Sequence, residues 1–234
     1  MVSVIARFLL VIVVGYLLGS IPFGLLIGRR SGVDVRRIGS GKTGATNVMR
    51  SVGVGPALLV AVGDTAKGAA AVLLSQHILA SPLALGAPHA GLAPWAAALA
   101  GLAAIAGHNY PIYIGFKGGR GVATTGGTAL ALALPVALIS LVFFIVPIVV
   151  TRYVSLGSII GAATLPFVYL VALKLGIEQS SDGLPTFLAL FIAGAAIIVS
   201  HGDNIKRLMA GTERKLGEKA GSPKGSARPY THTP

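Results

Sequence analysis

Long apolar segments alternate with clusters of basic residues along the chain, and this alternation restricts the possible folds more than any other feature. Basic side chains are costly at the centre of a bilayer, so their clusters mark segments that lie outside it. Sixteen of the 19 Lys and Arg residues fall at 29–50, 117–120, 152 and 206–228. The segments between these clusters predict membrane spans near 4–27, 54–79, 92–107, 122–134, 136–151, 157–175 and 184–201.

Composition supports a membrane protein and excludes several other classes. Hydrophobic residues make up 54% of the 234 residues and charged residues only 11%, against about 25% charged residues in an average soluble domain. Such a chain lacks the polar surface of an ordinary cytosolic enzyme. The absence of cysteine excludes disulfides, thiolate catalysis, cysteine-based zinc sites and iron–sulfur clusters. We therefore predict an all-α, polytopic membrane protein.

The division at Pro135 decides how many spans there are. If 122–151 formed one span, the total would be six, and the sixteen clustered basic residues would divide eight and eight between two faces. With seven spans they share one face, which the positive-inside rule makes cytoplasmic. We therefore predict a bundle of about seven transmembrane helices with the N-terminus outside and the C-terminus cytoplasmic.

The two ends of the chain differ in character. The first apolar segment is longer than the core of a signal peptide and no cleavage site follows it, so we expect it to be retained as a span. Residues 1–216 are predicted to form one integral membrane domain. Residues 217–234 are polar and basic, and we expect a disordered tail there.

The segment 28–53 holds six glycines and six basic residues, with hydroxyl and amide side chains between them. Glycine-rich turns expose consecutive backbone N–H groups that bind anions, and a helix starting near Thr43 or Ala45 would add its positive end. A flexible cytoplasmic loop would explain the charge but not the interleaved polar side chains. The segment predicts phosphate or carboxylate binding. It is not a P-loop, because Arg36 stands where that motif requires glycine.

Two further segments would meet the first at the same face. One is 107–127, where Lys117 and Arg120 flank two glycines, and the other combines 152–159 with 201–215. Their convergence predicts a single site for a ligand with more than one anionic group. The alternatives are a transporter of a phosphorylated metabolite and a scaffold that binds anionic lipids. Basic residues gathered at one face favour a site over a pathway.

Polar residues within or near the spans leave further choices open. Asp64 and Lys67 lie three residues apart, so they can pair on one helical face, either for function or to hold the bundle together. His108 and His201 are either acid–base groups or hydrogen-bonded structural residues. The sequence has neither a nucleophile elbow nor metal-ligand spacing. It therefore predicts no cofactor, metal or nucleic-acid partner, and any catalysis would depend on binding and electrostatics.

Three motifs, in the same order along the chain, resemble those of the bacterial acyl-phosphate:glycerol-3-phosphate acyltransferase family (PlsY) over roughly residues 15–215. They are GSIPFG at 19–24 with GSGKTGATNVMR at 39–50, GHNYPIYIGFKGGRGVAT at 107–124, and RYVSLGSI at 152–159 with HGDNIKRLMAGTERK at 201–215. The sequence differs from the family pattern at Lys42, Arg120 and Gly202, where Asn, Lys and Arg are usual.

The resemblance implies a seven-span enzyme of the bacterial inner membrane with its active site on the cytoplasmic face. Such an enzyme moves a fatty acyl group from acyl phosphate to the sn-1 hydroxyl of glycerol 3-phosphate. The products are lysophosphatidic acid and phosphate, in phospholipid biosynthesis. The implied partners are these two substrates, membrane lipids and an enzyme that produces acyl phosphate.

From this resemblance we predict the catalytic residues Ser40, Arg50, Lys117, His201 and Asn204. The predicted substrate-binding residues are Gly39, Gly41, Gly44, Thr46, Asn47, Gly118, Gly119, Arg120, Ser155, Ser158 and Arg207. Arg50 and Lys117 would bind phosphate, while His201, Asn204 and one of the two serines would orient glycerol 3-phosphate. Acyl phosphate is already activated, so no covalent intermediate is expected. The proton of the attacking hydroxyl would pass to the donor's phosphate or to His201.

Overall fold

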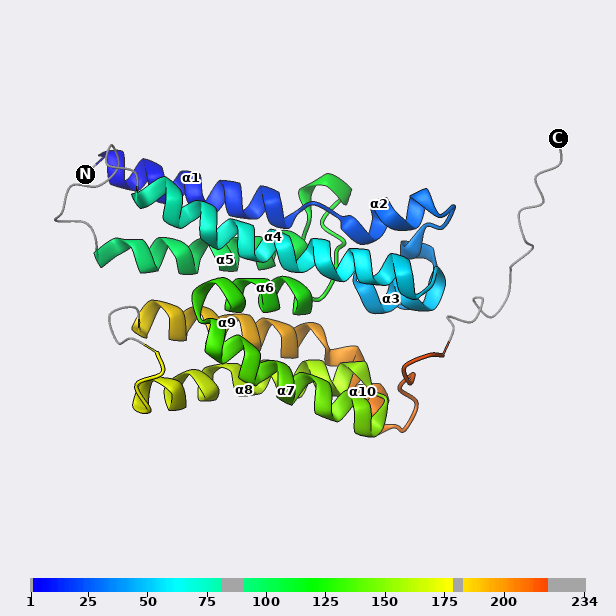
Figure 1. The fold of residues 1–234 in the computed structure, drawn as a ribbon. Helices are drawn as coiled ribbons and strands as arrows, with labels where there is room; N and C mark the ends of the chain where they lie inside the picture. The colour runs from blue at the N-terminus through cyan, green and yellow to red at the C-terminus, as the bar shows by residue number, and fades with distance from the viewer. Residues whose placement is uncertain (1, 81–90, 179–182, 219–234) are drawn as a thin grey trace.

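The computed structural model describes residues 2–80, 91–178 and 183–218, and every regular element within them is helical. Long helices lie side by side along one direction (Figure 1). They are α1 (Val2–Gly19), α4 (Val54–Ala80), α5 (Ala93–Asn109), α6 (Val122–Leu132), α7 (Leu134–Thr151), α8 (Val154–Lys174) and α9 (Gly183–Ser200). The prediction of an all-helical chain is confirmed, and a helix occupies each predicted span. Residues 219–234 of the predicted tail lie outside the described residues.

Five segments are long and apolar enough to cross a membrane. They are Val4–Arg30, Val54–Ile78, Leu134–Thr151, Val154–Lys174 and Gly183–Ser200. The other two helices at predicted spans are shorter: α5 has 17 residues and α6 has 11. The total of seven spans and the orientation of the termini therefore remain predictions.

The boundary near Pro135 lies where the sequence predicted a division. Helix α6 ends at Leu132, Ala133 is extended with φ −155° and ψ 79°, and α7 begins at Leu134. Proline in the first turn of α7 is favourable because its missing N–H would have no helical partner there. The chain reverses direction between the two helices (Figure 1).

The first predicted span, 4–27, matches the membrane-length segment Val4–Arg30, but that segment contains two helices. Helix α1 ends at Gly19, and a second helix, α2 (Phe23–Arg30), begins after a break at Pro22. Proline removes a backbone donor and clashes with the preceding helical turn, so it ends α1. The Nζ of Lys67 on α4 donates to the carbonyl of Ile21 within this break at 2.9 Å. A buried side chain therefore compensates for the interruption.

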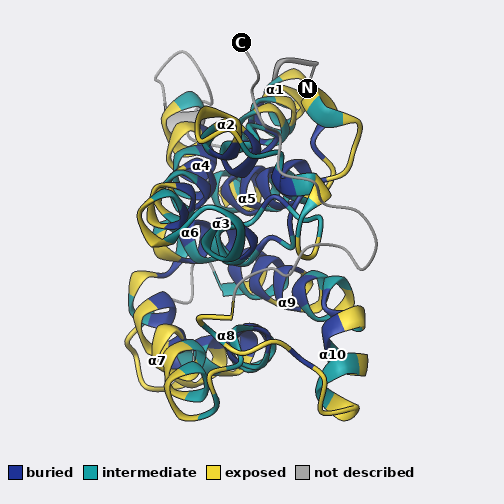
Figure 2. Cartoon of the chain, turned by 90° about the vertical axis from the view of Figure 1, so that its right-hand side faces the viewer, coloured by how far each residue is buried: buried dark blue, intermediate teal, exposed yellow. Residues whose placement is uncertain are grey.

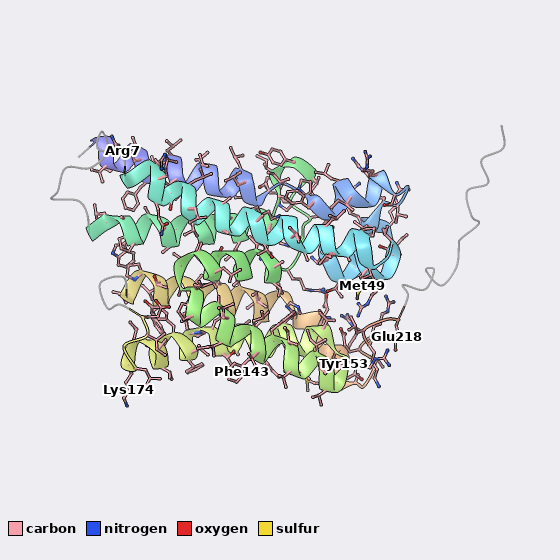
Figure 3. All side chains as sticks on the ribbon, viewed as in Figure 1. Arg7, Met49, Phe143, Tyr153, Lys174 and Glu218 are labelled. Carbon is pink, nitrogen blue, oxygen red and sulfur yellow. The ribbon has the colours of Figure 1, made fainter. Side chains whose placement is uncertain are left out.

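The basic segments gather at one end of the bundle. That end carries α2, the 3₁₀ turn η1 (Val35–Arg37), α3 (Ala45–Ser51) and α10 (Gly202–Met209) (Figure 1). A helix does begin at Ala45, as predicted. Arg7 and Lys174 lie at the opposite end (Figure 3).

Apolar side chains cover the outside of the bundle and small residues fill the spaces between helices. On α7, Val149 and Val150 are 72% and 76% exposed, and Phe143 lies on the outer surface (Figure 3). Figure 2 shows exposed residues on the outer faces of the helices and buried residues between them. A Cβ at Gly19 would overlap the backbone of Ala104, so α1 and α5 pack with their backbones in close contact. This arrangement suits a lipid environment.

Candidate functional site

A cavity of about 410 Å³ opens at the basic end of the bundle and extends inward between helices. Its mouth is polar and is lined by Ser40, Lys42, Thr46, Asn47, Arg50, Arg120, His201, Asn204 and Glu213. Farther along α6, α7 and α8 the lining becomes apolar, with Ala129, Leu130, Ala137, Leu141, Phe144, Ala162 and Leu165. One cavity therefore offers both a polar and an apolar environment.

Asn47 holds together the loop that forms one side of the mouth. Its side chain is buried, and its Oδ1 accepts a hydrogen bond from the backbone N of Ser40 at 3.0 Å. Its Nδ2 donates to the backbone carbonyls of Val35, Ile38 and Lys42. Gly39 and Gly41 adopt the left-handed φ values of 65° and 68° that the loop requires. Asn47 was predicted to bind substrate; it lines the cavity, and its polar groups are used to hold the loop, while direct contact with substrate stays a prediction.

Two guanidinium groups line the mouth of the cavity, one from α3 and one from the turn before α6. Arg50 on α3 donates from Nη2 to the carbonyl of Arg214 at 3.0 Å, and its Nε is buried without a hydrogen-bond partner in the described chain. Arg120 donates from Nε to the carbonyl of Ser200 at 3.0 Å. Burial lowers the pKa of both groups, yet arginine stays protonated at neutral pH. Neither forms an ion pair with a carboxylate among the described residues, so both can bind an anion.

Lys117 does not line the cavity, although it was predicted to bind phosphate there. Its side chain is exposed, whereas Gly118 and Gly119 pack behind the turn against His108 and Asn109. The backbone N of Gly119 donates to the carbonyl of His108 at 3.1 Å. This turn directs Arg120 inward and Lys117 outward. The sequence shows only two cations on either side of a glycine pair, so it could not predict which of them enters the cavity.

His201 lies at the start of α10 and lines the mouth of the cavity. Its Nδ1 is 2.8 Å from the carbonyl of Ile197. A carbonyl only accepts hydrogen bonds, so Nδ1 carries the proton and Nε2 keeps a free lone pair. Burial, with the nearby charge of Arg120, lowers the pKa of His201 to about 4. The imidazole is therefore neutral at pH 7 and offers an acceptor.

Glu213 joins several polar residues on the same side of the mouth, and the predicted site did not include it. Its Oε1 accepts from Asn204 Nδ2 at 2.7 Å and from Ser155 Oγ at 2.9 Å, and its Oε2 accepts from Arg207 Nε at 2.7 Å. Burial opposes ionisation, but these hydrogen bonds outweigh it and hold the pKa of Glu213 below its ordinary value. The sequence signal was a lone carboxylate in the basic segment 206–215.

The hydrogen bonds to Glu213 determine what its neighbours offer to a ligand. Asn204 uses Nδ2 for Glu213, so its buried Oδ1 remains an acceptor without a partner among the described residues. Ser155 gives its hydroxyl proton to Glu213 and keeps its lone pairs. Ser158 donates to the carbonyl of Val154 at 2.9 Å, and both serines line the cavity.

Most predicted site residues come together in this one cavity. Those that line it are Ser40, Gly44, Thr46, Asn47, Arg50, Arg120, Ser155, Ser158, His201 and Asn204. Those that do not line it are Gly39, Gly41, Lys117, Gly118, Gly119 and Arg207. Arg207 does not line the cavity itself but forms an ion pair with Glu213, which does.

The chain is similar to known acyltransferases over nearly all of its length. A relative from Rubrobacter xylanophilus, a glycerol-3-phosphate acyltransferase, is 42% identical over 212 residues, which cover 91% of this chain and 96% of the relative. Glycerol-3-phosphate acyltransferase 3 of Dehalococcoides mccartyi (strain CBDB1) is 46% identical over 220 residues, covering 92% and 99% of the two chains.

Two solved structures share the fold. The glycerol 3-phosphate form of PlsY (YgiH), an integral membrane glycerol 3-phosphate acyltransferase, matches with a TM-score of 0.75 and 35% identity, covering 90% of this chain and 96% of that one. The lysophosphatidic acid form of PlsY matches with a TM-score of 0.74 and 34% identity, covering 90% and 95%. The family model for glycerol-3-phosphate acyltransferase matches residues 9–211. The chain therefore belongs to the glycerol-3-phosphate acyltransferase family of integral membrane proteins.

Proposed function

We propose that this protein transfers a fatty acyl group from acyl phosphate to the sn-1 hydroxyl of glycerol 3-phosphate, as a step of phospholipid biosynthesis. The observation that carries this proposal is one cavity with two guanidinium groups at its mouth, Arg50 and Arg120, and apolar walls farther in. The mouth suits phosphate groups and the inner part suits an acyl chain. The solved relatives named for glycerol 3-phosphate and lysophosphatidic acid support the acceptor and the product.

The proposed reaction needs no protein nucleophile. The hydroxyl oxygen of glycerol 3-phosphate forms a bond to the carbonyl carbon of acyl phosphate, and the bond from that carbon to the phosphate oxygen breaks. The hydroxyl proton goes to the departing phosphate, which yields lysophosphatidic acid and inorganic phosphate. The protein would contribute orientation of the two substrates and stabilisation of the charge that develops on the carbonyl oxygen.

We assign the phosphate contacts to Arg50 and Arg120, with the Ser40 hydroxyl as a further donor, because the backbone amides of 40–42 already donate within the loop. Both guanidinium groups face the cavity, and charge-assisted bonds to phosphate are among the strongest available to a protein. Lys117 would reach a ligand in this cavity only through a rearrangement of its turn.

Three acceptors at the mouth would take hydrogen bonds from the glycerol hydroxyls. They are His201 Nε2, Asn204 Oδ1 and the lone pairs of Ser155, because their neighbours already use the corresponding donors. We propose that His201 orients the acceptor while phosphate takes the proton. The variant His201→Ala should then raise the KM for glycerol 3-phosphate with little change in kcat. A fall in kcat of about 100-fold or more would instead identify His201 as the general base.

We also propose seven spans in the bacterial inner membrane, with the N-terminus outside and the active site and C-terminus cytoplasmic. The mouth of the cavity is lined by residues of the basic segments, and such clusters are typical of the cytoplasmic side. Helices α2, α3 and α10, which belong to these segments, lie at one end of the bundle (Figure 1). Residues 1–216 would form the membrane domain, followed by a basic tail. A cytoplasmic mouth would also allow direct supply from an enzyme that produces acyl phosphate.

Phosphate release by the purified protein in detergent tests the proposal. Glycerol 3-phosphate is offered with palmitoyl phosphate or, in parallel, with palmitoyl-CoA. We expect release that requires both palmitoyl phosphate and glycerol 3-phosphate, and no turnover of the thioester. A folded protein that binds glycerol 3-phosphate but uses neither donor would contradict the proposal and favour transport of a phosphorylated metabolite.

A further inference from the structure

A buried cluster of three ionisable residues lies at the inner side of the polar mouth, and the proposed reaction does not use it. Asp64, Lys67 and His108 are 2%, 5% and 5% exposed. Asp64 Oδ1 lies 2.8 Å from Lys67 Nζ and 3.4 Å from His108 Nδ1. Burying charged groups inside a membrane domain costs free energy and requires partners of opposite charge, so such groups usually have a function beyond packing.

Lys67 connects the cluster to the wall that carries Ser40 and Arg50. Its Nζ donates to the carbonyl of Ile21 at the break between α1 and α2, and it lies 5.9 Å from the ring centroid of Phe23. The next residue, Gly24, packs so closely against the backbone of Thr43 that a Cβ would overlap the carbonyl oxygen. A shift of Lys67 would therefore move the start of α2, and α2 in turn would move the loop at 38–44 that it packs against.

His108 connects the cluster to a second wall of the cavity, the one that carries Arg120. Its carbonyl accepts a hydrogen bond from the backbone N of Gly119, and its ring packs so closely on Gly119 that a Cβ there would overlap Nε2. The following residue is Arg120, which lines the cavity. The orientation of the His108 ring therefore affects where the turn places the Arg120 guanidinium.

We propose that Asp64 is a positioning residue that sets the separation of the two cationic walls of the cavity. One carboxylate oxygen contacts both Lys67, which holds the start of α2, and His108, which supports the turn that carries Arg120. Asp64 and His108 also line the inner side of the cavity, but Asp64 Oδ1 is already engaged by Lys67 and His108, so Asp64 acts through the segments that these two residues hold. The identity of the ligand in this inference rests on the proposed function.

The test compares variants that break one connection at a time. His108→Gln removes the imidazole contact while Lys67 stays paired with Asp64, so the bundle keeps its buried ion pair. The double variant Asp64→Asn/Lys67→Met removes both charges together and leaves no unpaired buried cation. Ser75→Ala is the matched control, because Ser75 is buried on the same helix and bonds only to the carbonyl of Val72 in the described structure.

Two quantities are measured for each variant in detergent: the KM for glycerol 3-phosphate, and the rise in unfolding temperature that glycerol 3-phosphate produces. A misplaced cationic wall should raise the KM about tenfold and remove most of the ligand-induced stabilisation, while kcat changes less. We expect this in His108→Gln and in the double variant, and wild-type values in Ser75→Ala.

Outcomes of a different kind would overturn the proposal. A role in bundle stability alone would lower the unfolding temperature and the amount of active protein but leave the KM unchanged. Wild-type KM and stabilisation in a folded His108→Gln would overturn it even if the double variant does not fold. The ligand-induced stabilisation does not depend on turnover, so it tests the positioning role separately from the proposed acyl transfer.

Discussion

The polar mouth of the cavity and its apolar inner part are built in different ways. At the mouth, directed hydrogen bonds fix the side chains: Asn47 binds its own loop, Glu213 binds three donors, and His201 binds Ile197. The inner part has small and aliphatic residues such as Ala137 and Leu165, whose volume sets the shape. Changes at the mouth should therefore alter substrate binding and rate, whereas changes farther in should alter the choice of acyl chain.

Arg120→Ala should have the largest effect, because it removes a buried cation from the mouth. Loss of a charged partner from a buried phosphate costs about 3 kcal/mol, or a fall of about 100-fold in kcat/KM. Steady-state kinetics with palmitoyl phosphate and glycerol 3-phosphate measure this. Arg120→Lys is the control that keeps the charge and should recover part of the loss. Activity near wild type in Arg120→Ala would remove Arg120 from the site.

Glu213→Gln tests the hydrogen-bond network that joins Ser155, Asn204 and Arg207 at the mouth. The Gln carbonyl can still accept from Asn204 and Ser155, but its amide faces the guanidinium of Arg207, which also donates. We expect kcat/KM to fall about tenfold, corresponding to about 1.5 kcal/mol for a lost charge-assisted bond. Arg207→Met should produce a similar loss by removing the other partner. A loss in only one of the two variants would contradict a shared role.

The pH dependence of stability tests the environment of His201. Its pKa in the folded protein is about 4, below the ordinary value of 6.5, so the unfolded chain binds the proton more readily between these values. The stability that neutral His201 contributes is complete above about pH 6.5 and is lost as the pH falls toward 4. Wild type should lose about 1 kcal/mol more than His201→Gln between pH 7 and 5.5. Parallel loss in both proteins, measured by thermal unfolding, would show an ordinary pKa.

Ala137→Leu tests whether the inner part of the cavity limits the length of the acyl chain that the enzyme accepts. Three added carbons would fill space between α6 and α8, so long donors should lose more rate than short ones. The ratio of kcat/KM for palmitoyl over decanoyl phosphate should fall about fivefold, corresponding to about 1 kcal/mol. Ala195→Leu on the exposed side of α9 is the matched control. Equal losses for both donors would show that this region does not hold the acyl chain.

Lys117→Ala should have the smallest effect and separates two predictions. The motif resemblance predicts loss of most activity, whereas an exposed side chain outside the cavity predicts a change of about twofold or less. The same kinetic assay decides between them. A loss as large as that of Arg120→Ala would require the turn at 117–121 to rearrange when substrate binds.

Much of the fold could be predicted because its signals are local in the chain. Helix positions followed from apolar segments of membrane-spanning length between basic clusters, and the division near Pro135 followed from charge asymmetry. The break at Pro22 was missed although proline is a known helix terminator. The break was missed because the apolar segment 4–27 continues on both sides of Pro22. Proline is also often tolerated within membrane helices. Only the contact from Lys67 to Ile21 shows how this break is stabilised.

The site was predicted less completely because side-chain direction depends on contacts between distant segments. The motifs identified the right segments, but the turn at 118–121 decides that Arg120 rather than Lys117 enters the cavity. Glu213 gains its importance from Ser155, which lies 58 residues away in the chain. The hydrogen bonds by which Asn47 holds its own loop also could not be predicted from its motif.

The sequence by itself determined that this protein is a helical membrane protein, which segments are helical and which carry the glycines, cations and hydroxyls that predict anion binding. These properties depend on hydropathy, charge and residue type, all of which are present in the chain before it folds. The tertiary structure decided which cations share a cavity, which hydrogen-bond donors are already used, and that the buried carboxylate of Asp64 contacts both Lys67 and His108. These depend on distances of a few ångströms between residues far apart in sequence, and only packing determines such distances.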